Sequence, residues 1–101
     1  MQFTVTPAAE ALLVALSGTF RFDDQEHFKG VLKAIDSFDG KGVTIDLAGT
    51  TALDSAGVGM LLLAHERAKK QGKTVSLRGA HGPVRQVLDV TKIDNIMTIH
   101  P

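Results

Sequence analysis

The chain of 101 residues fits one domain with a single hydrophobic core, and it is too short for two. Hydrophobic residues make up 44% of the chain, which argues against intrinsic disorder, and the zero formal net charge without blocks of like charge argues against nucleic-acid binding. The absence of cysteine excludes disulfides and cysteine-ligated metal sites.

No part of the sequence has the pattern of a targeting signal or a membrane span. Residues 1–6 lack a basic run followed by an apolar stretch, and no apolar run approaches the length of a span. We therefore expect a cytoplasmic protein that binds neither membrane nor nucleic acid. The one basic cluster complements the dipole of a predicted helix end and comprises Arg67, Lys69, Lys70 and Lys73.

The first part of the chain predicts two strands followed by a helix. Gln2–Thr6 alternates weakly and predicts an edge strand. Ala11–Leu16 is nearly all apolar, which is typical of a strand buried on both faces, and Gly18 is expected to end it. Asp23 and Asp24 supply helix N-cap chemistry. The apolar residues of the amphipathic helix that follows are Phe28, Val31, Leu32 and Ile35.

The rest of the chain predicts two more helices and three more strands. Val43–Leu47 is rich in β-branched residues and predicts a central strand. A second helix is expected to run from near Ser55 to about Gln71. Pro83 fits the first position of a third helix, with an inner face of Val84, Val87, Leu88 and Thr91. Short strands are predicted at Thr74–Leu77 and Ile96–Ile99. This alternation predicts an α/β (α+β-like) domain.

Motifs of common enzyme classes are incomplete in this chain. Ser55 has Leu53 two places before it, where the nucleophile elbow of a hydrolase needs glycine. Gly57 and Gly59 precede Leu62, where a dinucleotide fingerprint needs a third glycine. The four histidines are too scattered for a metal site: His27, His65, His81 and His100. We therefore expect no enzyme activity, no metal and no other cofactor.

The most informative stretch is the entry to the second helix. Ser55 or Asp54 could serve as a plain N-cap there. Alternatively, a helix N-terminus tolerates a phosphate on Ser55, whose roughly two negative charges could abolish docking while the fold stays intact. Gly57 and Gly59 each cost the helix about 1 kcal/mol. Close approach of another backbone, internal or from a partner, would explain them.

This stretch resembles the signature of the STAS domain, the fold of anti-sigma factor antagonists. In that family a strand ending in Asp-Leu precedes an Asp-Ser-(Ser/Thr/Ala)-Gly-(Leu/Val)-Gly segment at the start of the second helix. Asp46 and Leu47 match the first part, and the segment from Asp54 to Gly59 matches the second. The resemblance covers essentially the whole chain. It implies a single STAS-type domain over residues 1–101, with helices packed on a mixed sheet of about four or five strands.

The resemblance also implies partner switching in a bacterial regulatory pathway. An anti-sigma factor that is also a serine kinase would bind the unphosphorylated protein and phosphorylate Ser55, and a PP2C-type phosphatase would reset the switch. Two residues depart from the family pattern. Ala56 replaces a frequent second hydroxyl, and Arg21 stands where the loop after the second strand often carries an acidic residue. The implied partner-binding residues are Asp54, Ser55, Ala56, Gly57 and Gly59.

The helical register adds Leu63 to this surface. The sheet should cover the side of the second helix that carries Leu61, Ala64 and Ala68, which leaves Leu63 on the opposite, polar side. Leu63 then lies about 12 Å from Ser55 along the helix axis, within reach of one partner. The alternative function is a non-switching STAS subunit of a transport complex. The retained serine favours the switch, because such subunits can dispense with the hydroxyl.

Overall fold

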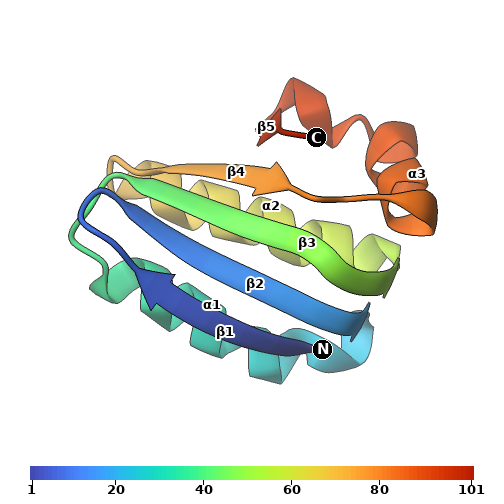
Figure 1. Ribbon diagram of the computed structural model, residues 1–101, viewed down its shortest axis with the longest axis horizontal. Coiled ribbons are helices and arrows are strands. Elements are labelled where there is room, and N and C mark those ends of the chain that lie inside the picture. The colour runs from blue at the N-terminus through green and yellow to red at the C-terminus, as the bar shows by residue number, and fades with distance from the viewer.

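One five-stranded mixed sheet forms the centre of the computed structural model, which describes residues 1–101 (Figure 1). Its strands follow chain order: β1 (Gln2–Pro7), β2 (Ala11–Phe20), β3 (Gly42–Leu53), β4 (Thr74–Arg78) and β5 (Thr98–Ile99). β1 pairs antiparallel with β2, and the remaining neighbours pair in parallel. The expected mixed sheet of four or five strands is confirmed.

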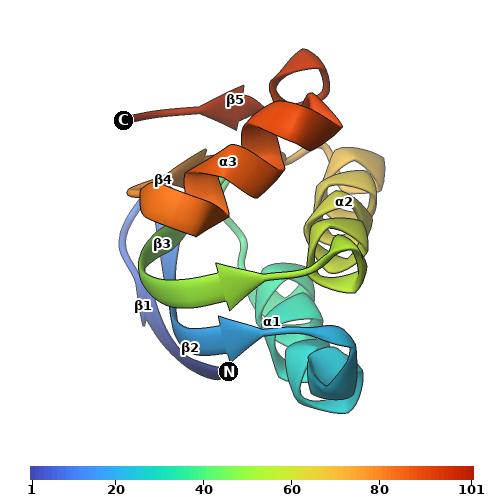
Figure 2. The same cartoon turned by 90° about the vertical axis from the view of Figure 1, so that its right-hand side faces the viewer.

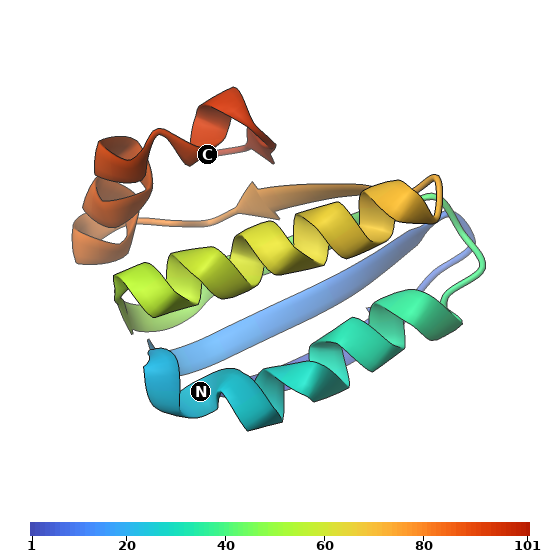
Figure 3. The ribbon, with the colours of Figure 1, turned by 180° about the vertical axis from the view of Figure 1, so that it is seen from behind.

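Three α-helices pack on this sheet. α1 (Gln25–Ser37) joins β2 to β3, and α2 (Ser55–Lys70) joins β3 to β4, as crossovers between parallel strands require. Both lie side by side on one face of the sheet and begin at the same end of it (Figure 3). α3 (Gly82–Thr91) contacts β3, and short 3-10 turns lie at η1 (Phe22–Asp24) and η2 (Ile93–Asn95). None of the helices has the length and apolarity to cross a membrane.

The hydrophobic core fills the layer between the sheet and the two long helices. Val14, Ile45 and Leu77 point into this layer from three neighbouring strands, and all three are fully buried. Ile35 of α1 and Leu61 of α2 meet them from the other side. The register expected for α2 is confirmed, because its fully buried residues are Leu61, Ala64 and Ala68, whereas Leu63 is 50% exposed.

The other face of the sheet is largely open, which corrects the expectation for β2. This strand is buried on one face only: Leu13 and Ala15 are half-buried and Ala11 is exposed. Both right-handed crossovers place their helices on the same side, so no long helix covers the other (Figure 2). The β2 residues that face α1 and α2 are the buried ones, Leu12, Val14 and Leu16.

The two central strands extend further than the sequence predicted. β2 continues through Gly18 to Phe20, and β3 continues past Leu47 to Leu53. Gly18 has φ +80°, a conformation that glycine adopts without strain. The pairing register between β2 and β3 shifts between Ala15 and Ser17 and again between Gly18 and Thr19. Such bulges allow a ladder to continue with a bend. The glycine therefore bends the strand and does not end it.

The C-terminal segment also differs from the expectation. Only Thr98–Ile99 of the predicted last strand pairs with β4, because the turn η2 precedes it. Ile96, predicted to lie in that strand, is 51% exposed. Thr91, predicted on the inner face of α3, is also exposed, and its hydroxyl donates to the carbonyl of Val87 at 2.8 Å. The hydroxyl is satisfied within its own helix, so the core does not need it.

A carboxylate ties the C-terminal parts of α1 and α2 together. Asp36 accepts hydrogen bonds from Arg67 Nη2 and from Gln71 Nε2, each at 2.6 Å. Lys73 Nζ donates to the carbonyl oxygen of Ile35 at 2.6 Å. Part of the basic cluster expected to complement the helix dipole therefore also joins α2, and the turn after it, to α1.

We predict that Asp36 titrates below the ordinary range. The hydrogen bond from Arg67, and then that from Gln71, lowers the pKa of this carboxyl. A lowered folded-state pKa gives stability that is present at neutral pH and is lost as the pH falls through the folded pKa. Arg67→Gln should raise the pKa of Asp36, as measured by carboxyl NMR titration, and should make unfolding less pH-dependent between about pH 5 and pH 3.

The exposed Lys70 offers a matched control on the same helix, because the structure gives it no ion-pair partner. Lys70→Gln should leave the pKa of Asp36 where it is in the parent protein. An Asp36 that titrates in the ordinary range in the parent protein would contradict the geometry of this pair.

Candidate functional site

Asp54 is the N-cap of α2. Its backbone is extended, with φ −104° and ψ −179°, and its Oδ1 accepts a hydrogen bond from the Gly57 N–H at 2.8 Å. This bond satisfies one of the backbone donors that every helix start leaves unpaired. Of the two residues that the sequence offered as a cap, Asp54 takes the role. Ser55 becomes the first residue of the helix, exposed and with its hydroxyl not needed for capping.

The second oxygen of the same carboxylate reaches a different segment. Asp54 Oδ2 accepts a hydrogen bond from the Phe22 N–H at 3.2 Å, and the Asp54 N–H donates to the carbonyl oxygen of Phe20 at 3.4 Å. Asp54 therefore joins the end of β2, the turn η1 and the start of α2. The backbone of Phe22, a residue that is 62% exposed, is thereby held beside the helix start. Sequence analysis did not single out Phe22, since the pairing spans 32 residues.

The two glycines of the predicted site have different environments. Gly57 is buried, and a Cβ atom there would collide with the Leu53 side chain and lie 2.7 Å from the carbonyl oxygen of Phe20. The fold itself therefore requires Gly57. Gly59 is exposed, and a Cβ atom there would meet nothing within 4 Å. Internal packing explains the first glycine and leaves the second unexplained.

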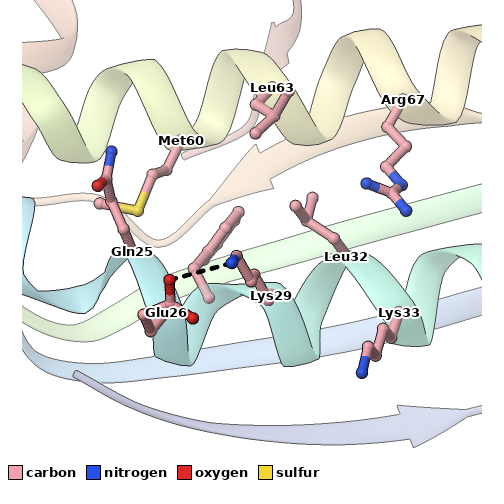
Figure 4. A pocket seen from close by; sticks show the side chains of 9 residues that line it. Gln25, Glu26, Lys29, Leu32, Lys33, Met60, Leu63 and Arg67 are labelled. Atoms are coloured by element: carbon pink, nitrogen blue, oxygen red, sulfur yellow. Dashed lines mark hydrogen bonds and ion pairs between the residues drawn. The ribbon is translucent and has the colours of Figure 1, made fainter.

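A groove of about 490 Å³ lies between α1 and α2 (Figure 4). Met60 and Leu63 border it from α2, and Leu32 borders it from α1. Lys29, paired with Glu26 at 3.0 Å, belongs to its charged rim. Leu63 thus offers apolar surface at the edge of a groove that α2 borders from Met60 to Arg67.

The aspartate of the strand motif, Asp46, makes contacts that are separate from those of Asp54. Asp46 Oδ1 accepts a hydrogen bond from the Ala48 N–H at 2.9 Å, and its Oδ2 pairs with Arg78 of β4 at 3.2 Å. Asp46 therefore supports the bend of β3 and its pairing with β4. No three His, Asp or Glu side chains lie close enough together to hold a metal ion.

The sequence-predicted site residues fall into two groups. Ser55, Gly59 and Leu63 recur every four residues and form an exposed strip along α2, which we call the α2 strip. Asp54 and Gly57 are instead engaged in contacts within the protein. The half-buried Ala56 lies beside Ser55 and offers no hydroxyl.

Comparison with known proteins agrees with this architecture. A family model described as "Mlab, STAS domain" matches residues 3–99. A STAS-domain containing protein of Pseudomonas aeruginosa (strain UCBPP-PA14) is 27% identical over 101 residues, which cover 98% of this chain and 99% of that protein.

Solved structures with the same fold include regulators and a transporter protein. An anti-sigma factor antagonist from Mycobacterium paratuberculosis superposes with a TM-score of 0.85 and 21% identity, over 99% of this chain and 85% of that one. The antagonist SpoIIAA in its unphosphorylated form gives 0.80 and 17%, over 97% and 87%. A sulfate transporter family protein from Wolinella succinogenes gives 0.75 and 19%, over 89% and 75%. With the family match spanning nearly its whole length, the chain belongs to the STAS domain family.

Proposed function

We propose that this protein is a phosphorylation-switched regulator of the anti-sigma factor antagonist type. In its unphosphorylated form it binds an anti-sigma factor that is also a serine kinase. The observation that carries the proposal is the division of roles at the start of α2. Because Asp54 caps the helix through the Gly57 N–H, the exposed Ser55 hydroxyl can be modified without loss of the cap.

In the proposed cycle the chain is substrate and docking partner, and the catalysts are its partners. Ser55 Oγ attacks the γ-phosphorus of ATP held by the kinase, so an O–P bond forms and the bond to the ADP oxygen breaks. The hydroxyl proton passes to a base of the kinase. A PP2C-type phosphatase reverses the modification, with water supplying the oxygen that leaves with phosphate and the proton that returns to Ser55.

The position of Ser55 suits a switch that acts on binding and spares the fold. A phosphate at a helix N-terminus is favoured by about 0.3–1 kcal/mol through the helix dipole. It adds about two negative charges at the N-terminal end of the α2 strip. Neutral residues at Gly59 and Leu63 complete that strip, so the phosphate would change its character from neutral to strongly acidic. A partner that fits the neutral strip would be released.

A second function is supported by the similarity to the sulfate transporter family protein. The chain would then be a non-switching subunit bound to a permease or ATPase of a transport complex. Charge on Ser55 separates the two proposals, because only the switch requires that phosphorylation change binding.

The discriminating experiment is a pull-down with Ser55→Ala and Ser55→Glu forms of the chain, followed by identification of the retained proteins. Retention of a histidine-kinase-like ATPase by the alanine form, and its loss from the glutamate form, would support the switch. A transport ATPase or permease retained equally by both forms would overturn it in favour of the second function.

We predict that Ser55 is the only residue phosphorylated by the captured kinase. Nearby Thr50 is buried, with its hydroxyl directed at the carbonyl oxygen of Leu16, whereas Thr51 is exposed and serves as the internal control. Incubation with ATP and mapping by mass spectrometry tests this. Phosphate on Thr51 with Ser55 unmodified would show that another hydroxyl is the acceptor.

Leu63→Ala should weaken binding of the captured kinase at least about tenfold, since truncation of an interface anchor costs about 2 kcal/mol or more. Because Leu63 is 50% exposed, the melting temperature should hardly change. Titration calorimetry and thermal unfolding measure the two effects. Leu61→Ala is the contrasting variant, since it removes buried volume and should lower stability by about 2–5 kcal/mol. Unaltered binding of the kinase by Leu63→Ala would show that Leu63 is not part of the binding surface.

Alanine at the two glycines of α2 should have opposite effects on stability. Gly59→Ala should stabilise the protein by up to about 1 kcal/mol, because the position is open and alanine favours the helix. Gly57→Ala should destabilise it, because the new methyl group meets Leu53 and the Phe20 carbonyl. Chemical denaturation measures both. If Gly59 admits close approach of the kinase, Gly59→Ala should also bind it more weakly; equal affinity would show that the strip is not approached there.

A further inference from the structure

One carboxylate holds both halves of the surface around Ser55. Asp54 Oδ1 accepts from Gly57 of α2, and Asp54 Oδ2 accepts from Phe22 of η1. Ser55 is the next residue along the chain and is exposed. We propose that Asp54 is a positioning residue through which a charge on Ser55 changes the position of Phe22. In this proposal Phe22 is a second apolar anchor for the partner that docks over Ser55. The inference rests on the proposed function and specifies its partner and its regulation.

Phe22 differs from the other aromatic residues near this end of the sheet. Phe20 is fully buried and stacks on Phe28 with ring centroids 5.3 Å apart. Phe22, two residues later, leaves 62% of its surface exposed. A single exposed apolar residue needs no explanation in itself. Here the backbone N–H of that residue is bonded to the cap of the Ser55 helix, so its position depends on the state of that cap.

The partner that fits this surface has a specific chemistry. It would offer an apolar pocket to the exposed Phe22 ring and apolar contact to the exposed Leu63. Over Ser55 itself it would fit a neutral hydroxyl closely. Aromatic side chains are frequent anchors at the centre of protein interfaces, because they bury large areas at low entropic cost.

A phosphate on Ser55 would act on Asp54 through its charge, which repels the neighbouring carboxylate. Of the two bonds that this carboxylate accepts, the one from the Phe22 N–H is longer, at 3.2 Å against 2.8 Å for the Gly57 N–H. The repulsion therefore weakens the bond from the Phe22 N–H first. The phosphate would therefore disrupt docking directly and also by releasing the aromatic anchor.

Amide exchange of the isolated ¹⁵N-labelled chain tests the link without any partner. Ser55→Glu supplies the charge, and Ser55→Gln is the uncharged control of the same size. The Phe22 amide should exchange with water about fivefold faster in the glutamate form, which corresponds to about 1 kcal/mol of repulsion. The Val58 amide, bonded to the backbone oxygen of Asp54 at 3.1 Å, should be unaffected. Equal exchange of Phe22 in both forms would overturn the link, whatever the outcome for the kinase.

Asp54→Asn separates the two bonds of the carboxylate. Asparagine keeps one acceptor oxygen for the Gly57 N–H and is an equally good N-cap, but its amide group cannot accept from Phe22. Exchange of Phe22 should become faster in this variant and should no longer respond to Ser55→Glu, while Val58 stays protected. A full response to Ser55→Glu in the Asp54→Asn background would show that Asp54 is not the link.

The anchor role has a separate test. Phe22→Ala should weaken binding to the captured kinase at least about tenfold without a change in melting temperature. Val90→Ala is the control, because Val90 is 80% exposed on α3 and outside the proposed surface. Unchanged affinity of Phe22→Ala, beside the expected loss for Ser55→Glu, would reject the anchor and leave the proposed switch intact.

Discussion

The arrangement of the site depends on the two hydrogen bonds accepted by the Asp54 carboxylate. One begins α2, and the other fixes the turn that leads into α1. Without this carboxylate, the helix start and the η1 turn would have no side-chain bond between them. It frees the Ser55 hydroxyl from capping and places Phe22 beside it. The same residue thus explains why the exposed Ser55 hydroxyl takes no part in capping.

The position of the site follows from the topology of the sheet. β2 and β3 are parallel, so the helices that follow them both begin at the carboxyl ends of these strands. Ligands of open α/β sheets bind at that edge, and here it carries Ser55 and Phe22. Towards the other end of the helices, the ion pair of Asp36 and Arg67 joins α1 to α2. The groove between them is bordered by Arg67 of this pair and by Leu63 of the proposed docking surface.

Helical periodicity was sufficient to predict the register of α2. Leu61 shares its helix face with the apolar Ala64 and Ala68, whereas Leu63 shares its face with the charged Arg67. The strand pattern was not sufficient for β2, since an apolar run does not reveal that both crossovers cover the same face of the sheet. The choice between Asp54 and Ser55 as the cap depended on backbone geometry that either residue type permits. Phe22 could not be found because the hydrogen bond that links it to the site joins residues distant in sequence.

The proposed docking site is the helix-start edge that carries Phe22 and Ser55, and not the open face of the sheet. Hydrogen exchange of the unphosphorylated chain, with and without the kinase captured by the Ser55→Ala bait, tests it most directly. Slower exchange is expected at Phe22 and along residues 55–63 in the complex, with no change at Thr44 and Ser76 of the open face. Protection confined to the open face, with exchange unchanged at Phe22 and along α2, would contradict it.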